Sequence, residues 1–335
     1  MTDVLVTTER QIVHGAKRSD LDTDLVRRHI KGAVDGRGYT GPTDPDEYLA
    51  RHRCLRETDH GVVPTVLGIL AFSPDPERWL DQSGIDIAQF SSNSPNSTQR
   101  TFNVQLRGPL SDLINRAVDI LWARSDHRIV LDKGTERIED HAYDRVVLRE
   151  LTVNALCHRD WGIEGAIVRI QIFPDYTEWI TPGGLPPSVT VNNLRTAQLA
   201  RNPSLAQILS HAGFVDRFGL GIDTVLDILE AAGSPPPFLQ DVGDGDSRQF
   251  TFRVWKKPLA DAADAAPLRP IKLSRRQNRI VDLLARQGLR SAGEIADELR
   301  EPRRNIQRDL QVLAQEGIVV SNGVSVATRY RLANR

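Results

Sequence analysis

The sequence predicts an α+β fold for most of the chain and a small separate domain at its C-terminal end. In the longer part, segments with apolar residues at helical spacing are intermixed with segments in which apolar and polar residues alternate. This mixture, without regular strand–helix repeats, favours an α+β sandwich built on a mainly antiparallel sheet. Residues 257–270 (KPLADAADAAPLRP) are rich in Ala, Pro and Asp and show no amphipathic period. We interpret them as the linker between the two parts.

Four parts follow from this division. They are an N-terminal α+β region with a possible role in dimerisation (1–100), a central domain (101–256), the linker (257–270) and a C-terminal domain (271–335). The boundary at residue 100 rests on the polar stretch SSNSPNSTQRT, residues 91–101, which has the composition of a loop.

Composition excludes several classes of protein. The chain has 335 residues, of which 40% are hydrophobic and 26% charged, as in an ordinary globular protein. It contains no apolar run of about 18 residues, and its first residues lack the basic-then-apolar order of a signal peptide. Two cysteines, Cys54 and Cys157, suit a reducing compartment. We therefore expect a cytoplasmic protein with no membrane partner.

Periodicity predicts the elements of the N-terminal and central parts in order. Residues 20–36 (DLDTDLVRRHIKGAVDG) form a helix, while 65–72 and 85–90 are short apolar segments. A strand at 102–106 precedes a helix at 110–123.

The second half of the central part begins with a helix that starts near residue 145. Two strands follow, 166–173 and 176–181, separated by a turn at Pro174-Asp175. After the glycine turn PGGLPP we expect two short helices, the second with Asn202 as its cap, Pro203 in its first turn and Gly213 as its stop. A helix at 221–232 and a strand at 249–255 complete this part.

The C-terminal part predicts three helices and a β-ribbon. The helices are 274–288, 291–300 and 302–317, and Ser291 with Glu294 form a capping box for the second. The third turns Ile306, Leu310 and Leu313 inward. Asn322-Gly323 marks a tight turn, and residues 324–332 then alternate in polarity. This order predicts a winged helix-turn-helix.

Charge in the C-terminal part points to a polyanion. The whole chain carries a net charge of −1, yet residues 271–335 contain 13 Lys and Arg against 7 Asp and Glu. The candidate DNA-contacting residues on the third helix and on the ribbon are Arg303, Arg304, Asn305, Gln307, Arg308, Arg329 and Arg331. A merely solvated helix face, or a winged helix that docks a protein, are the alternatives.

The helix at the start of LRELTVNALCHRDWG (148–162) carries a polar stripe. Glu150, Asn154 and His158 recur every four residues on an otherwise apolar helix. The amide oxygen of Asn154 suits Mg²⁺, and the carboxylate of Glu150 could take a proton from an attacking water. His158 and Arg159 are spaced to meet phosphate oxygens. A solvated stripe without function is the alternative.

Glycine turns follow the stripe along the chain. Gly183 and Gly184 lie in Pro182–Pro186, and Gly219 and Gly221 open a predicted helix. Backbone N–H groups at such turns can surround a phosphate. Taken alone, Gly183-Gly184 could equally be a plain turn between two elements.

Together these motifs resemble the Bergerat ATP-binding fold of the GHKL superfamily, which includes gyrase-type topoisomerases, MutL and sensor histidine kinases. More closely, ELTVNALCHRDW, ITPGGLPP, ARNPSLAQIL and DRFGLGI are similar to a bacterial group of RecG-related, Schlafen/AlbA-type transcriptional regulators. These regulators have a GHKL-like ATPase domain and a C-terminal winged helix. The resemblance covers roughly residues 60–255. The fold class expected is thus a GHKL α/β sandwich with an N-terminal α+β region and a C-terminal winged helix-turn-helix.

The resemblance implies a role for each motif. Glu150 would be the general base and Asn154 the Mg²⁺ ligand, while His158 and Arg159 would face phosphate. The segment 187–217 would be a lid over ATP. The other residues implied to contact the nucleotide are Thr181, Gly183, Gly184, Arg201, Asn202, Gly219 and Gly221. Thr181 stands where members usually carry an Asp that binds the adenine amino group.

We therefore expect an ATP–Mg²⁺-responsive transcription regulator that binds double-stranded DNA as a homodimer. A DNA-associated ATPase of DNA repair or phage defence is one alternative. A DNA-binding scaffold with a degenerate nucleotide site is another, and the sequence leaves open whether ATP is hydrolysed. The chain has no G-x-x-x-x-G-K-[ST] phosphate loop, which argues against a helicase motor.

Overall fold

The computed structural model describes residues 7–59, 61–94, 97–131, 137–186, 188–195, 199–215, 221–257, 273–315, 318–322 and 328–332. The chain divides into two compact units. The first unit comprises Met1–Asn115 and Val146–Lys256, and the second comprises Arg116–Arg145 and Lys257–Arg335.

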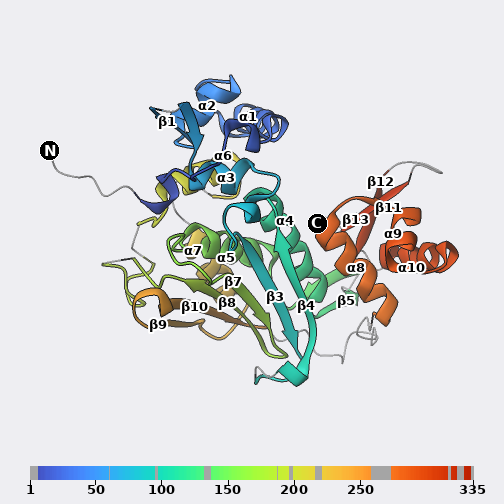
Figure 1. Ribbon diagram of the computed structural model, residues 1–335. Helices are drawn as coiled ribbons and strands as arrows, with labels where there is room; N and C mark the ends of the chain where they lie inside the picture. The colour runs from blue at the N-terminus through green and yellow to red at the C-terminus, as the bar shows by residue number, and fades with distance from the viewer. Residues whose placement is uncertain are drawn as a thin grey trace. The chain divides into compact units, whose positions relative to one another are not determined.

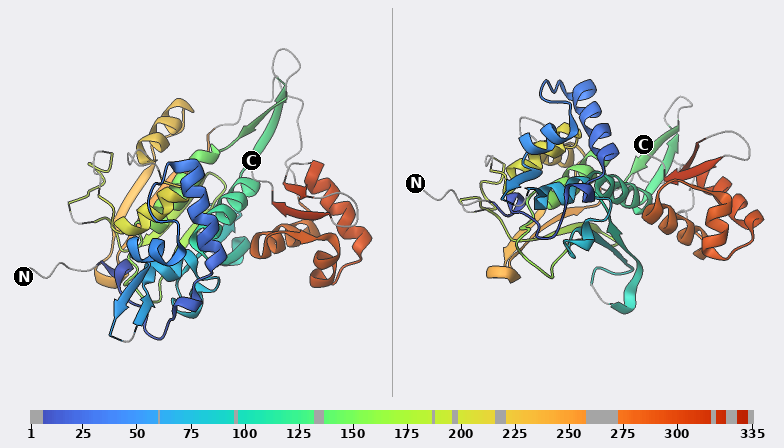
Figure 2. Two further views of the ribbon diagram at one scale, coloured as in Figure 1. Left: turned by 90° about the horizontal axis from the view of Figure 1, so that it is seen from above. Right: turned by 45° about the horizontal axis from the view of Figure 1, so that its top comes forward.

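The N-terminal region of the first unit is a small group of helices and one hairpin. The α1 helix begins where the Asp22 carboxylate accepts hydrogen bonds from the amides of Asp24 and Leu25, and it ends at Gly38, whose φ is 62°. Figures 1 and 2 show α1, α2 and α3 lying beside α6, which comes much later in the chain. The elements are α1 (Thr23–Arg37), α2 (Pro45–Arg51), β1 (Leu55–Thr58), β2 (Gly61–Pro64) and α3 (Val66–Phe72).

A six-stranded mixed sheet forms the centre of the first unit. Its order is β4-β3-β7-β8-β10-β9; β3 and β7 are parallel and every other pair is antiparallel. The expected α+β architecture with a mainly antiparallel sheet is confirmed. The strands are β3 (Gly84–Phe90), β4 (Arg100–Arg107), β7 (Val168–Ile172), β8 (Tyr176–Pro182), β9 (Phe238–Val242) and β10 (Gln249–Trp255).

The sheet extends across the boundary that the sequence predicted at residue 100. The polar stretch 91–101 connects β3 to β4, and these two strands pair along their whole length, from Gly84 with Arg107 to Phe90 with Arg100. A polar loop between two paired strands has the same composition as a loop between domains, so composition alone could not separate the two cases.

Helix α5 (Arg145–Cys157) packs against the centre of this sheet. Every residue of β8 is buried, as expected for a strand with neighbours on both sides. The indole Nε1 of Trp179 on β8 donates a hydrogen bond to Thr152 Oγ1 on α5 at 3.1 Å. Thr152 in turn donates to the carbonyl of Leu148. This contact fixes the register of α5 on the sheet.

One of the two short helices predicted after PGGLPP is absent from the described residues. Residues 188–195 form turns instead, in which Asn193 accepts from the Thr190 amide at 2.6 Å and donates to the Ser188 carbonyl at 2.9 Å. Such local side-chain bonds compete with helix formation. The second predicted helix exists as α6 (Pro203–His211), and α7 (Gly221–Ala231) follows.

The cap of α6 differs from the predicted one. Asn202 occupies the cap position, yet its side chain makes no cap hydrogen bond. The buried carboxylate of Glu9 takes this role, because it accepts from the amides of Ser204 (3.0 Å) and Leu205 (2.7 Å). A residue almost two hundred positions away therefore stabilises this helix end, where a negative charge is favoured.

The described residues from 273 onward in the second unit form three helices and a three-stranded antiparallel sheet with the order β11-β13-β12. The predicted capping box of Ser291 and Glu294 is present. Ile306, Leu310 and Leu313 are fully buried, as their spacing predicted. The elements are α8 (Arg275–Gln287), β11 (Arg290–Ser291), α9 (Ala292–Leu299), α10 (Arg303–Gln315), β12 (Val319–Asn322) and β13 (Arg329–Leu332). The predicted turn at Gly323 and the ribbon residues 324–327 lie outside the described residues.

The second unit also takes in residues that the sequence analysis had assigned to the central domain. These are the last part of α4 (Leu110–Arg124) and the hairpin of β5 (His127–Leu131) and β6 (Arg137–His141). Arg124 explains the association, since its guanidinium contacts Asn278 Oδ1 and Asp282 Oδ1 on α8 at 3.2 and 3.3 Å. Of the predicted linker, Lys257 alone is described.

Candidate functional site

A cavity of about 410 Å³ lies in the first unit, between α5, the sheet and the segment that follows PGGLPP. Its volume is within the range of roughly 300–1,000 Å³ that small-molecule sites usually have. All three residues of the α5 stripe line it: Glu150, Asn154 and His158. The stripe therefore faces a partly open pocket, in which Glu150 is buried and Asn154 and His158 are half-buried.

The sheet contributes an apolar floor to this cavity. Trp179 and Thr181 of β8 line it, and so do their direct partners on β10, Phe252 and Phe250. Residues two apart on a strand share one face, so these four side chains form a square on the same side of the sheet. Thr181 is the polar member of the square and is 4% exposed.

The carboxylate of Glu150 is held between its neighbour on α5 and the start of α7. Its Oε1 accepts from Arg149 Nη2 at 2.9 Å. Its Oε2 lies so close to Gly221, the first residue of α7, that a Cβ added there would be 2.7 Å away. A side chain at Gly221 would therefore displace this carboxylate or the start of α7, and both residues line the cavity.

His158 enters the cavity as a neutral imidazole. Burial, and after it the neighbouring Arg201 guanidinium, lowers the pKa of His158 to about 4. A neutral imidazole offers one donor and one acceptor but no positive charge. Cys157, also on the cavity wall, is inert near neutral pH, because burial raises the pKa of its thiol to about 12.

Arg159 and Asn202, both expected to contact nucleotide, do not line the cavity and instead donate to backbone carbonyls. Arg159 is fully buried and donates to the carbonyls of Asp160, Ile163 and Ala166, at 2.8, 3.0 and 2.7 Å. Its guanidinium also lies 4.4 Å from the ring centre of Trp161. Because this guanidinium is fully buried, serves three carbonyls and does not line the cavity, we do not include Arg159 among the ligand contacts.

Asn202, the second of these residues, is 2% exposed and donates to the carbonyls of Cys157 and Arg159, both at 2.8 Å. It therefore closes the C-terminal end of α5, where unpaired carbonyls need donors.

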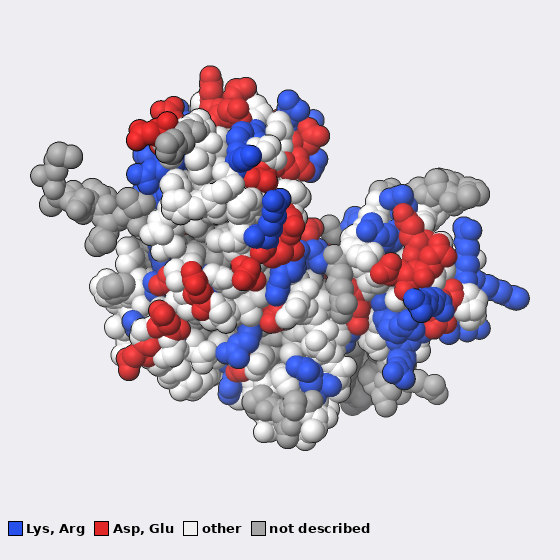
Figure 3. Space-filling view, viewed as in Figure 1, with Lys and Arg blue, Asp and Glu red and all other residues white. Residues whose placement is uncertain are grey.

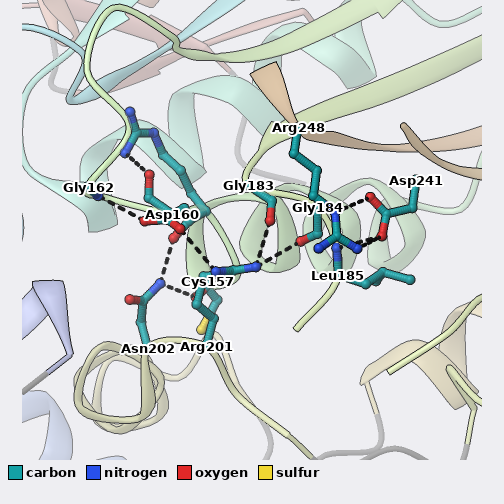
Figure 4. A network of polar contacts seen from close by, with 11 residues as sticks. Cys157, Asp160, Gly162, Gly183, Gly184, Leu185, Arg201, Asn202, Asp241 and Arg248 are labelled. Carbon is teal, nitrogen blue, oxygen red and sulfur yellow. Dashed lines mark hydrogen bonds and ion pairs between the residues drawn. The ribbon is translucent and has the colours of Figure 1, made fainter. Parts of the chain in front are cut away.

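Arg201 ties together three loops at one end of the cavity (Figure 4). It contacts Asp160 Oδ2 at 3.1 Å and donates to the carbonyls of Gly183 at 2.7 Å and Gly184 at 3.1 Å. Gly183 has a φ of 110°, and a Cβ there would be 2.4 Å from the Cβ of Asp160. Arg201 and Gly183 do not line the cavity, but Arg201 holds Gly184, which does.

An ion pair supports the glycine turn from the opposite side. Arg248 and Asp241 contact one another at 2.6 Å, and Asp241 also accepts from the Leu185 amide at 3.1 Å. The Gly183 amide donates to the Arg248 carbonyl at 2.7 Å. Figure 4 shows this pair and Arg201 on either side of Gly184. The turn is thus held in one conformation before any ligand binds.

The described part of the predicted lid covers the cavity. Val189, Leu194 and Leu199 line it from this segment, and Arg195 pairs with Asp223 at 3.2 Å and with Asp227, both on α7. Exposed ion pairs of this kind contribute little energy, so they can break when the segment moves. Of the glycines expected at the start of α7, Gly219 lies outside the described residues.

The cavity suits a nucleotide with a magnesium ion. Among the described residues, no three His, Cys, Asp or Glu side chains gather into a metal site. Mg²⁺ needs no such cage, because it usually takes one or two protein oxygens together with phosphates and waters. Asn154 would hold the ion, and the amide oxygen is free, since no described residue accepts from or donates to this side chain. Bound there, Mg²⁺ would neutralise phosphate charge.

Of the candidate DNA-contacting residues of the second unit, four are exposed on α10, and the other three are half-buried or lie near an acidic side chain. Arg303, Arg304, Gln307 and Arg308 are exposed on α10. Arg329 is exposed on β13 but lies 3.6 Å from Glu294, and the half-buried Arg331 donates to the Leu332 carbonyl. Asn305 is half-buried. Figure 3 shows Lys and Arg side chains projecting from this unit beside a group of acidic ones.

Several residues of the site could not be found from the sequence. Asp160 stands next to the stripe, and its place after His158-Arg159 was a weak signal. Asp241, Arg248 and Glu9 gave none, because each acts on a backbone group from a distant or irregular part of the chain. The aromatic residues of the floor could be predicted as core, but their position as cross-strand neighbours on β8 and β10 could not.

None of the described helices combines the length and the apolar character that a membrane span requires.

Comparisons with known proteins agree with part of this description. No curated protein matches the chain. A solved structure, that of the DIP2311 protein from Corynebacterium diphtheriae, is similar in fold with a TM-score of 0.57 at 18% identity. The likeness covers 98% of this chain but 65% of that chain, so this chain spans less than two-thirds of the other's length. Residues 165–251 match the family described as "Putative ATP-dependent DNA helicase recG C-terminal". The match takes in β8, the glycine turn, α7 and the start of β10, so the chain contains an ATPase-like domain of this RecG C-terminal type.

Proposed function

We propose that this protein is a DNA-binding transcription regulator whose affinity for DNA responds to ATP and Mg²⁺. The observation that carries the proposal is the convergence of Glu150, Asn154, Gly184 and Gly221 on one cavity. Gly184 and Gly221 are distant in the chain from Glu150 and Asn154, and together these residues are the acid, the amide and the glycine turns that nucleotide chemistry needs.

The second unit supplies the DNA-binding part of the proposal. We infer that α8, α9, α10 and the small sheet act as a winged helix-turn-helix, with α10 as the recognition helix. Three exposed arginines on α10 and a basic balance in this part of the chain support the inference. Such modules commonly read paired half-sites, and we therefore expect the protein to bind double-stranded DNA as a homodimer.

Nucleotide would influence DNA binding through the cover of the cavity. The Arg195 ion pairs hold that segment on α7, and a ligand with a higher affinity for the closed arrangement would shift the population toward it. The effect is reciprocal, so DNA must change nucleotide affinity by the same factor.

A titration of a random-sequence pool of labelled DNA duplexes, with and without ATP and Mg²⁺, tests this proposal. We expect the two curves to differ by at least about fivefold in affinity, the lower end of typical coupling. Asn154→Ala should abolish the difference and leave binding without nucleotide unchanged. Coincident curves for the wild-type protein would refute the coupling.

A second candidate function is an ATPase that uses the C-terminal part to dock on DNA. The position of Glu150 favours it, because the carboxylate faces the cavity beside Asn154. Such a group could accept a proton from a water that attacks the terminal phosphate. DNA-stimulated hydrolysis that Glu150→Gln abolishes would select this function. If Asn154→Ala changed neither nucleotide binding nor its metal dependence, the third reading, a scaffold with a degenerate nucleotide site, would be favoured.

A further inference from the structure

We infer that His158 and Thr181 contact the base of the bound nucleotide and not its phosphates, and that the site accepts adenine and guanine nucleotides with similar affinity. The inference rests on the proposed nucleotide function and adds the placement and the specificity of the ligand.

Two contacts fix how α5 and β8 run past each other. Trp179 donates to Thr152 at 3.1 Å, and the Asp160 amide donates to the Pro182 carbonyl at 2.9 Å. The segment from Thr152 to Asp160 therefore runs beside the segment from Trp179 to Pro182, in the same direction. Thr181 lies one residue before Pro182, and His158 lies two residues before Asp160, so both are close to the second contact. These two side chains consequently line the same end of the cavity.

Glu150 lies at the other end. It precedes the first contact, and it approaches Gly221 at the start of α7. Eight residues separate Glu150 from His158, which corresponds to about 12 Å along a helix. The N-terminus of α7 is the end that favours negative charge. A triphosphate would therefore extend toward Asn154 and Gly221, and the base would lie toward Thr181 and His158.

The groups at the base end are free to bind. Within the described part of the chain, neither the Thr181 hydroxyl nor a His158 ring nitrogen makes a hydrogen bond. Thr181 is 4% exposed as a whole residue and lines the cavity. Its cross-strand neighbour Phe250 adds an apolar surface beside it.

The chemistry of these two groups sets the specificity. A hydroxyl and a neutral imidazole can each donate or accept. The lowered pKa of His158, due to burial and Arg201, keeps this imidazole neutral at physiological pH. The pair can therefore satisfy the amino group and ring nitrogen of adenine, or the carbonyl and N–H of guanine, by exchanging roles. A carboxylate, which only accepts, would not have this freedom.

Calorimetry on the full chain at pH 7 tests the inference with three probes, each with Mg²⁺: ATP, GTP and inorganic tripolyphosphate. We expect wild-type affinities for ATP and GTP within about tenfold of one another. His158→Phe and Thr181→Val should each lower the affinity for ATP and for GTP by roughly fivefold or more, and should leave the affinity for tripolyphosphate unchanged. Unchanged tripolyphosphate affinity also shows that the variants are folded. Asn154→Ala is the matched control and should weaken all three probes alike.

Three results would overturn the inference while leaving the proposed function intact. In the first, His158→Phe weakens tripolyphosphate as much as ATP, which would make His158 a phosphate contact. In the second, neither variant changes nucleotide affinity. In the third, wild-type protein prefers one purine by more than about a hundredfold. Failure of the wild-type protein to bind any probe would instead overturn the proposed function, and this inference with it.

Discussion

Helices α5 and α10 both carry a row of polar residues, and the two rows have opposite surroundings. In α5 the apolar residues Leu148, Leu151, Val153 and Leu156 lie on several sides and all are buried. Its polar row therefore lies along a partly open cavity, where its residues are buried or half-buried. In α10 the apolar residues lie on one face, and Arg303, Arg304 and Arg308 are left to solvent.

This difference separates two kinds of candidate site. A helix that is apolar nearly all round must be buried, so each polar residue in it needs a partner, a cavity or a ligand. A helix with one apolar face has a polar side in any case, and function there depends on the type and charge of the exposed residues. The polar row of α5 is accordingly the stronger sign of a ligand.

The largest effect is expected where a buried charge next to the α5 row is removed. Arg159→Ala leaves three carbonyls without their donor, and we expect the free energy of unfolding to fall by about 3–5 kcal/mol. Urea denaturation followed by tryptophan fluorescence measures this. The matched variant on α10, Arg308→Ala, should change the value by less than about 0.5 kcal/mol. Similar losses for the two variants would remove the contrast between the helices.

Acid should destabilise the first unit through its buried histidines. The pKa of His158 and that of His29 are both lowered to about 4, first of all by burial. Between pH 6.5 and 4 the unfolded chain binds protons that the folded chain does not, so stability is complete above pH 6.5 and is lost as pH falls toward 4.

We expect each histidine to lower the free energy of unfolding by roughly 1–2 kcal/mol between pH 7 and pH 5, as measured by urea denaturation at the two pH values. His158→Gln should reduce the pH dependence by one such increment. An unchanged dependence would mean that the pKa of His158 is the same in the folded and the unfolded chain, which would contradict its burial.

A methyl group at Gly221 should disturb the α5 row without touching its residues. Its Cβ would lie 2.7 Å from Glu150 Oε2, so Gly221→Ala must displace the carboxylate or the start of α7. We expect ATP affinity, measured by calorimetry, to fall by about tenfold, which is about 1.4 kcal/mol. Gly32→Ala on α1 is the control, since no atom lies within 4 Å of its added Cβ, and it should leave ATP affinity unchanged. Equal effects of the two substitutions would contradict the packing argument.

The smallest effect is expected on α10. Arg308→Ala should weaken binding to random-sequence DNA by roughly three- to tenfold at low salt and reduce the dependence of log affinity on log salt by about one. Arg331→Ala should have a smaller effect, because Arg331 already donates to the Leu332 carbonyl. Fluorescence anisotropy at several salt concentrations distinguishes the two. If Arg331→Ala had the larger effect, β13 and not α10 would be the main contact.

The cavity residues could be predicted in part. Spacing along α5 identified Glu150, Asn154 and His158, because a stripe on one helix face is a local property. Thr181, Gly184 and Gly221 were named from motifs, and these residues do line the same cavity. Arg159 and Asn202 belong to the same motifs but donate to backbone carbonyls, and nothing in their spacing distinguishes these roles. Whether a polar side chain meets a ligand or a carbonyl depends on which loops fold over it.

By itself, the sequence determined the local features of this protein. Most of the helices, the strands β4, β7, β8 and β10, the capping box at Ser291 and the inward face of α10 follow from periodicity and from interactions between residues a few positions apart. The tertiary structure decided what depends on distant segments: the strand order with its parallel β3–β7 pair, the cap of α6 by Glu9, the loops joined by Arg201 and the enclosure of the cavity. The physical reason is that backbone donors and acceptors left over at helix ends and turns take whichever buried partner the packed fold brings to them.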